Sequence, residues 1–213
     1  RGHFHNDNSL AVLTDSPGII VAFPSNAADA PAMLRECLRM AHEDGRVVVF
    51  VEPIALYHTV DLSAPEDGQW MAPYVAPWDA NEIAFGELGL YGNGTQLAII
   101  TYGNGYYLSR QAEAEIRASG IDLRIIDLRW LHPLNDQAIV EAVAGCRKIL
   151  IVDESRRSGS LSERLMTLLT EAGRSDAVSR ITAEDCFIPL GPAAELVLPS
   201  KASIIDAALH AVR

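Results

Sequence analysis

The chain has 213 residues, of which 49% are hydrophobic, and it carries a formal net charge of −11 at pH 7. This length allows one large domain or two modest ones, each with a full apolar core. The acidic field of the chain repels phosphate groups, which excludes nucleic acid and anionic membrane surfaces as expected partners. No apolar stretch approaches the length of a membrane-spanning helix.

The cysteines and the start of the sequence bear on where the protein works. Cys37, Cys146 and Cys186 lie far apart and form no Cys-x-x-Cys pair. We expect them to be reduced and, in the absence of a signal peptide, we expect a cytoplasmic protein. Because the sequence begins at Arg1 in a polar, histidine-rich segment with no preceding element, we expect a fragment of a longer protein.

The first 53 residues predict a strand–helix–strand unit. Residues 9–13 are typical of a short helix, and residues 28–42 have apolar side chains at helical spacing. Residues 19–23 and 47–51 are continuous apolar runs, which are typical of strands covered on both faces. The short connections favour parallel pairing of the two strands.

Residues 54–93 interrupt this pattern with several prolines and glycines, but they are rich in aromatic side chains. A flexible linker would contain fewer aromatic residues. We therefore expect an ordered crossover that packs on its neighbours, with a short strand or hairpin near residues 84–90.

The remainder of the chain alternates apolar strands with amphipathic helices. This alternation predicts an α/β fold with a mostly parallel sheet and helices on both faces. The expected strands are residues 97–101, 123–127, 148–152 and 178–182, and the expected helices are residues 106–118, 136–144, 160–172 and 201–212.

Functional groups in open α/β sheets gather beyond the carboxyl ends of the strands, and three segments fall there: residues 102–105, 127–133 and 153–159. The first contains a Gly-Asn-Gly sequence that lacks the full dinucleotide-binding spacing, which favours a tight strand-to-helix turn over an anion site. In the third, Asp153 and Glu154 point to opposite faces of a strand. This arrangement favours helix capping by Asp153 or Ser155, together with surface charge, over a carboxylate pair.

The histidines near the start leave two alternatives open. In an extended segment His3, His5 and Asp7 would share one face, as in a metal site. A histidine on an active-site loop could instead transfer protons, because imidazole titrates near neutral pH.

Five short motifs occur in an order that resembles one known family. They are Gly-His-Phe-His at 2–5, Pro-Gly-Ile at 17–19 with Pro-Ser at 24–25, Phe-Val-Glu-Pro at 50–53, Ile-Asp-Leu-Arg at 126–129, and Glu-x-x-x-x-Gly at 154–159. Together they resemble the beta subunit of thiamine-diphosphate-dependent 2-oxoacid dehydrogenases of the pyruvate and branched-chain type, within the transketolase superfamily. Glu52 and Pro53 favour this family over deoxyxylulose-phosphate synthase.

The resemblance implies three segments. Residues 1–53 would be the C-terminal part of a pyrimidine-binding domain, residues 54–93 an ordered crossover linker, and residues 94–213 a transketolase C-terminal domain.

The resemblance also implies oxidative decarboxylation of a 2-oxoacid and acyl transfer to lipoamide, with the cofactor as electron sink. His5 matches the family's active-site histidine, although Asn6 and Asp7 replace its usual Ser-Gln neighbours. No residue of this chain is assigned to cofactor or metal binding, because the family's activating glutamate and its Gly-Asp-Gly magnesium motif are absent. Thiamine diphosphate and magnesium are expected in the full enzyme, and the isolated chain is expected to bind neither and to be inactive.

The implied partners are an alpha subunit or a fused N-terminal half, a second copy in a dimer, and a lipoyl-bearing acyltransferase core. Two alternatives remain open from the sequence: a transketolase or deoxyxylulose-phosphate synthase-like enzyme, and a non-catalytic dimerisation or docking module. The sequence leaves the identity of the 2-oxoacid open.

Overall fold

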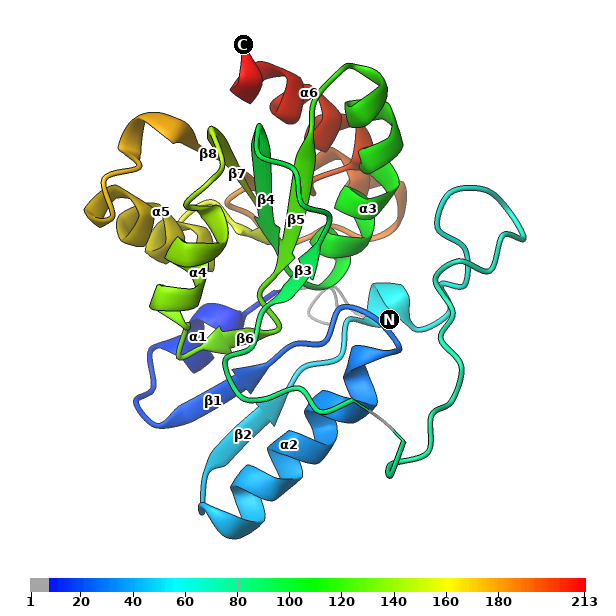
Figure 1. The fold of residues 1–213 in the computed structure, drawn as a ribbon, viewed down its shortest axis with the longest axis vertical. Helices are drawn as coiled ribbons and strands as arrows, with labels where there is room; N and C mark the ends of the chain where they lie inside the picture. Colours follow the sequence, from blue (N-terminus) through cyan, green and yellow to red (C-terminus); the bar gives the residue numbers. More distant parts are fainter. Residues whose placement is uncertain (1–7, 80) are drawn as a thin grey trace.

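The computed structural model describes residues 8–79 and 81–213, which form two sheets (Figure 1). A smaller sheet has the strand order β2 (Val47–Phe50), β1 (Ile19–Ala22), β6 (Trp130–His132). A larger sheet has the order β3 (Gly89–Tyr91), β5 (Leu123–Asp127), β4 (Leu97–Thr101), β7 (Lys148–Arg156), β8 (Val178–Ala183). One apolar cluster is shared by both sheets, because Val21 and Phe23 from the smaller sheet pack with Ile100 and Ile126 from the larger one. The two sheets therefore share a continuous core.

The smaller sheet is built on the predicted strand–helix–strand unit. β1 (Ile19–Ala22) pairs in parallel with β2 (Val47–Phe50), and α2 (Asp29–Glu43) connects them. Met33, Cys37 and Met40 recur at helical spacing and form the buried face of α2. This prediction is confirmed.

The third strand of this sheet, β6 (Trp130–His132), was not predicted. It pairs antiparallel with β1 and places Trp130 in the cluster beneath α2. A strand of three residues has too few positions to show an alternating pattern. It is also separated from β5 by a left-handed residue, Arg129, at φ 57°. A segment from late in the chain thus completes the smaller sheet.

The larger sheet confirms the predicted mostly parallel arrangement. Only its edge strand, β3 (Gly89–Tyr91), runs antiparallel, to β5. The parallel strands are β4 (Leu97–Thr101), β5 (Leu123–Asp127), β7 (Lys148–Arg156) and β8 (Val178–Ala183).

Helices cover both faces of the larger sheet, as expected. α3 (Gly103–Ala118) and α6 (Lys201–Val212) pack in one apolar cluster with the sheet. The cluster on the other face contains α1 (Leu10–Thr14), α4 (Asp136–Val143) and α5 (Leu161–Glu171).

Residues 54–79 and 81–88 lie between the strands of the two sheets and are only partly packed. A short 3-10 helix, η2 (Ile54–Leu56), follows β2, and Trp70 packs on Tyr106 and Tyr107 of α3. Other aromatic side chains of the crossover, including Trp78, are exposed. The boundaries at residues 53 and 94 stay predictions.

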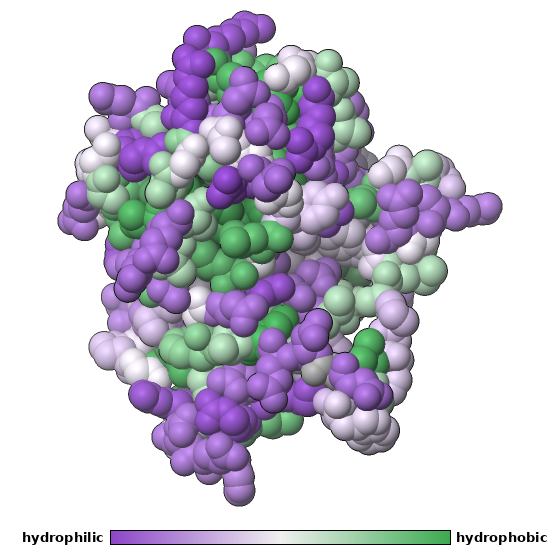
Figure 2. Space-filling view, viewed as in Figure 1, coloured by the Kyte–Doolittle hydropathy of each residue, from purple (hydrophilic) through white to green (hydrophobic). Residues whose placement is uncertain are grey.

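The surface of the molecule is mixed in character. Figure 2 shows polar side chains over most of one face, interrupted by apolar areas. Two further 3-10 helices, η3 (Ser175–Ala177) and η4 (Gly191–Leu196), lie in the C-terminal region. None of the helices described is long and apolar enough to cross a membrane.

Candidate functional site

The carboxyl ends of strands from both sheets meet at one junction, and the three segments predicted to gather there do so. The Tyr102 hydroxyl, after β4, donates to Asp153 Oδ1 of β7 over 2.6 Å. The Leu128 amide, after β5, donates to the carbonyl of Thr101 at the end of β4 over 2.9 Å. Backbone and side-chain hydrogen bonds therefore join all three strand ends.

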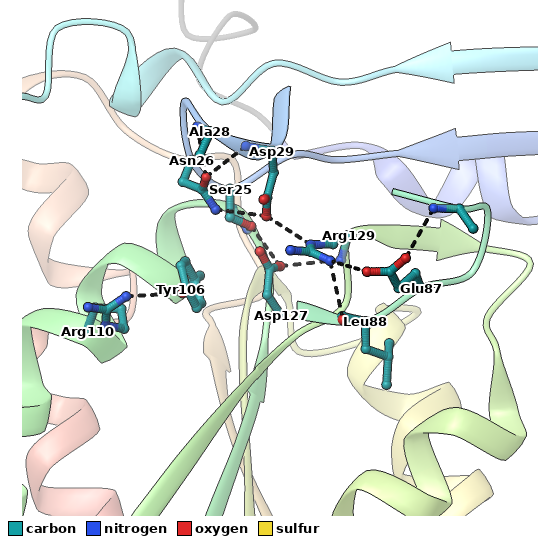
Figure 3. A network of polar contacts seen from close by, with 12 residues as sticks. Ser25, Asn26, Ala28, Asp29, Glu87, Leu88, Tyr106, Arg110, Asp127 and Arg129 are labelled. Atoms are coloured by element: carbon teal, nitrogen blue, oxygen red, sulfur yellow. Dashed lines mark hydrogen bonds and ion pairs between the residues drawn. The ribbon is translucent and has the colours of Figure 1, made fainter. Parts of the chain in front are cut away.

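Ser25 links the two sheets at this junction (Figure 3). Its hydroxyl donates to Asp127 Oδ1 over 2.8 Å and accepts from the Gly103 amide over 2.7 Å. Ser25 follows β1, whereas Asp127 ends β5 and Gly103 begins α3. A buried hydroxyl that both donates and accepts thus fixes the end of the smaller sheet against two elements of the larger one.

The Gly-Asn-Gly segment connects β4 to α3 directly, so the predicted tight turn is confirmed. The helix begins at Gly103, three residues earlier than expected, and Gly103 itself has φ 55°. A Cβ atom there would lie 2.5 Å from Phe23 Cε1. The Gly103 amide is used by Ser25, which leaves that amide unavailable to an anion.

Asp127 is a buried carboxyl group with one oxygen unsatisfied. Its residue is 1% exposed, and Oδ2 has no hydrogen-bond partner among the described residues. Burial raises the pKa of Asp127 to about 7, against the opposing effects of the Ser25 hydrogen bond and the positive charge of Arg129. This group therefore exchanges its proton near neutral pH.

Arg129 connects the junction to α2 and to the crossover. Its Nε lies 2.9 Å from Asp29 Oδ2, at the start of α2. Its Nη1 lies 3.3 Å from both Glu87 Oε1 and the carbonyl oxygen of Leu88 (Figure 3). Residues 127–133 were predicted to lie at this edge, but no local pattern predicts these partners, since Asp29 is 100 residues away from Arg129.

Asp153 has a structural role, and the prediction that its side chain caps a helix is confirmed. Its Oδ2 accepts a hydrogen bond of 2.8 Å from the amide of Ser162, in the first turn of α5. Its Oδ1 accepts from the Tyr102 hydroxyl and from the Ser155 amide. Both carboxylate oxygens are therefore engaged in holding the fold.

Glu154 is not the surface charge that the sequence predicted. It is partly buried, because β7 continues to Arg156 instead of ending at residue 152. The Asn104 side-chain amide donates to Glu154 Oε1 over 2.6 Å. Burial raises the pKa of Glu154 to about 7, the negative charge of Asp153 adds to this, and the Asn104 hydrogen bond opposes it.

Glu154 lines a pocket of about 790 Å³ between the two sheets. Apolar side chains from α1 and the ends of β1 and β2 form most of the wall. Among the described lining residues, the ionisable ones are both acids, Glu52 and Glu154. Asn8 and Ser9 also line the pocket. The predicted catalytic residue, His5, lies three positions before Asn8 and falls outside the described residues, as do His3 and Asp7.

The described residues do not fit the metal–diphosphate part of thiamine diphosphate. They contain no group of three or more His, Cys, Asp or Glu side chains placed to hold a metal ion. The polar groups at the junction are mainly used in hydrogen bonds within the chain. The described residues therefore supply no metal–diphosphate site.

The sequence of this chain matches a known family of protein domains. The model of the transketolase C-terminal domain matches residues 86–204, which is more than half of the chain. Pyruvate dehydrogenase E1 component subunit beta of Staphylococcus aureus is 28% identical over 207 residues, covering 96% of this chain and 59% of the relative. 2-Oxoisovalerate dehydrogenase subunit beta of Bacillus subtilis is 26% identical over 211 residues, covering 97% and 60%. The chain thus spans about 60% of the length of these relatives.

Solved structures show the same fold. A split-gene transketolase, described as an inactive beta4 tetramer, superposes with a TM-score of 0.72 at 19% identity, over 95% of this chain and 60% of that one. A 2-oxoglutarate:ferredoxin oxidoreductase from Magnetococcus marinus gives a TM-score of 0.61 at 15% identity, over 97% and 45%. The chain belongs to the transketolase C-terminal domain family, and its relatives in sequence are beta subunits of pyruvate and 2-oxoisovalerate dehydrogenases.

Proposed function

We propose that this chain is part of the decarboxylating component of a 2-oxoacid dehydrogenase complex, which oxidatively decarboxylates a 2-oxoacid and transfers the acyl group to lipoamide. One observation carries the proposal: the similarity to dehydrogenase beta subunits runs over 96–97% of the chain and so includes both sheets and their junction. The likeness to a transketolase, in contrast, is one of fold at 19% identity.

In this proposal the described residues support the reaction instead of performing it. The hydrogen bonds of Ser25 to Asp127 and Gly103 hold the strand ends of the two sheets together. A rigid support of this kind keeps catalytic groups in position. His5 is the proposed catalytic residue, which stabilises or protonates intermediates by exchanging a proton near neutral pH.

The cofactor and its metal belong to the full enzyme. Thiamine diphosphate supplies the electron sink for loss of carbon dioxide, and magnesium holds its diphosphate. We propose that an alpha subunit or a fused N-terminal half supplies the metal–diphosphate site. Further proposed partners are a second copy of the chain and a lipoyl-bearing acyltransferase core.

The test is an assay of the full-length enzyme, with its partner chain where the two halves are separate. Reduction of an artificial electron acceptor is measured with pyruvate, 3-methyl-2-oxobutanoate and 2-oxoglutarate, and acylation of a lipoyl domain is followed by mass spectrometry. The proposal predicts acceptor reduction and lipoyl acylation with at least one 2-oxoacid. Ketol transfer between sugar phosphates without lipoyl acylation would establish the transketolase alternative instead.

His5→Ala in the same enzyme tests the proposed catalytic residue. Removal of a positioned general acid–base group lowers a rate by about 10²–10⁴-fold. We expect such a loss of lipoyl acylation with cofactor binding retained, as measured by calorimetry. An unchanged rate of lipoyl acylation would show that His5 is not a catalytic residue.

A further inference from the structure

Glu154 lines the 790 Å³ pocket and carries an acceptor oxygen that no hydrogen bond among the described residues uses. Glu154 Oε1 accepts the hydrogen bond from Asn104, whereas no described hydrogen bond reaches Oε2. The second acid on the pocket wall, Glu52, follows β2 and accepts a 2.7 Å hydrogen bond from the Tyr57 hydroxyl. No lysine, arginine or histidine occurs among the described residues that line the pocket. Among the described lining residues, the ionisable side chains are therefore both acidic.

The edge of the pocket is apolar and exposed. Val12 and Ile54 line it and are 71% and 48% exposed. Leu196, in η4 between the lining residues Ala194 and Leu198, is 84% exposed. Large exposed apolar side chains around a cavity are typical of a surface that a partner protein covers. Interfaces of this kind are centred on an anchor side chain, often an arginine, that fills a pocket and is enclosed by apolar contacts.

We propose that this pocket receives a basic side chain, an arginine or a lysine, from the partner polypeptide that supplies the metal–diphosphate site in the proposed function. The assignment rests on the proposed function, which requires that partner. The aliphatic stem of the basic residue lies against the apolar wall, and its charged end donates to Glu154 Oε2. The charge of this chain, −11 overall, complements such a partner.

The ionisation of Glu154 gives the interaction a pH dependence with a defined sign. The charged and titratable groups near Glu154 are Asp153, the preceding residue of β7, Tyr102 after β4, and Glu52 on the wall of the same pocket, while Asn104 donates to it directly. Arg156, two positions further along β7, donates to the carbonyl of Cys186. Burial and the charges of Asp153 and Glu154 hold the pKa of Tyr102 well above its usual value, so that group stays neutral. With the pKa of Glu154 at about 7, its carboxylate predominates at pH 8 and its neutral form at pH 6. Binding of a cation should therefore weaken about tenfold from pH 8 to pH 6.

The test measures the affinity between the full-length chain and its separately purified partner chain at pH 6, 7 and 8. Glu154→Gln keeps the shape and the Asn104 contact but removes the charge, and it should weaken binding at least tenfold at pH 8 and abolish the pH dependence. Glu154→Asp retains a carboxyl group and should retain the pH dependence. Glu171→Gln removes an exposed charge at the end of α5, outside the pocket, and serves as the matched control that should bind as the wild type does.

For an enzyme with both halves on one chain, the rate of cysteine labelling is measured in place of the affinity between two chains. In a Cys186→Ser background, which removes the exposed native thiol, a cysteine introduced by Ala55→Cys in the pocket wall should react with a maleimide at least tenfold faster when Glu154→Gln is added, because the pocket then loses its occupant. An unchanged rate would overturn the inference.

Each result has one meaning. If the wild-type chains form no complex, the proposed function fails and the inference fails with it. If they form a complex but Glu154→Gln binds as tightly as Glu171→Gln, the inference fails and the proposed function stands. If Glu154→Gln alters only self-association of the chain, measured by sedimentation without the partner, a second copy occupies the pocket and the proposal is overturned.

Discussion

Ser25 and Asp127, which are 102 residues apart in sequence, share a buried hydrogen bond of 2.8 Å that joins the end of β1 to the end of β5. The same serine hydroxyl accepts from the Gly103 amide at the start of α3. The smaller and larger sheets are therefore tied together by one side chain at the edge where functional groups of α/β proteins gather.

Replacement of Ser25 tests how much its two hydrogen bonds contribute to the free energy of unfolding. Ser25→Ala removes the acceptor of the Gly103 amide and one donor to Asp127 Oδ1, which still accepts from the Arg129 amide at 3.3 Å. We expect a loss of about 2–3 kcal/mol in the free energy of unfolding. Urea unfolding measures it. Ser175→Ala, at an exposed serine in η3, is the matched control and should change stability by less than about 0.5 kcal/mol. Equal effects of the two variants would show that the junction adds no stability.

The raised pKa of Asp127 predicts how stability depends on pH. The folded protein holds this proton up to about pH 7, whereas the unfolded chain releases it near its ordinary value of 3.8. The folded state therefore binds more protons between these pH values, and stability contributed by this group falls as pH rises from about 4 to 7. Above pH 7 both states are ionised and the contribution is constant.

Asp127→Asn isolates that contribution, because the amide oxygen can still accept from Ser25 but the group no longer ionises. Glu154 also has a raised pKa and adds a similar slope, so the difference between wild type and variant is the quantity to compare. We expect the stability of wild type relative to the variant to decline with pH over this window, in urea titrations at half-unit intervals. A constant difference would mean that Asp127 ionises in the folded protein as it does in the unfolded chain.

Arg129 and Asp29 should show energetic coupling that exposed ion pairs lack. The two side chains are largely buried and lie 2.9 Å apart. A double-mutant cycle with Arg129→Ala and Asp29→Ala should give a coupling energy of about 1–3 kcal/mol. The exposed pair Lys201–Glu115, at 2.6 Å, is the matched control, and its coupling should stay below about 1 kcal/mol despite the shorter distance. Similar values for the two pairs would show that burial does not strengthen the junction pair.

Local pattern was enough to predict most of the fold. β1, β2 and β4 are continuous apolar runs, and α2 has its buried side chains at helical spacing, so each is visible in a short window of sequence. β6 is different, because its three residues form a strand only when β1 is present to pair with them. Pairing between segments about 110 residues apart leaves no local signal.

The location of the candidate site at the strand ends was predictable, but the contacts of its individual side chains were not. The three segments after β4, β5 and β7 were expected to gather, and the helix contact of Asp153 was among the favoured alternatives. The partial burial of Glu154 was not predicted, because β7 runs further than its apolar core and the residues around the pocket come from both sheets. Long-range contacts of charged side chains depend on packing that a single sequence does not display.

Gly103 provides a test of how tightly the two sheets fit at the junction. At φ 55° an alanine is strained, and its Cβ would in addition lie 2.5 Å from Phe23 Cε1, a contact that requires the ring or the backbone to move. Gly173 has φ 75° with nothing within 4 Å of an added Cβ, so Gly173→Ala measures the backbone strain alone, about 1–2 kcal/mol. We expect Gly103→Ala to cost at least about 1–3 kcal/mol more than this control in urea unfolding, because overpacking adds to the strain.

Movement of Phe23 or of the start of α3 would also lengthen the contact between Ser25 and the Gly103 amide. A combined Ser25→Ala and Gly103→Ala variant should therefore lose less stability than the two separate losses added together. Strictly additive losses would indicate that Gly103 and Ser25 act independently, and that the fit of the glycine against Phe23 does not position the hydrogen bond between the sheets.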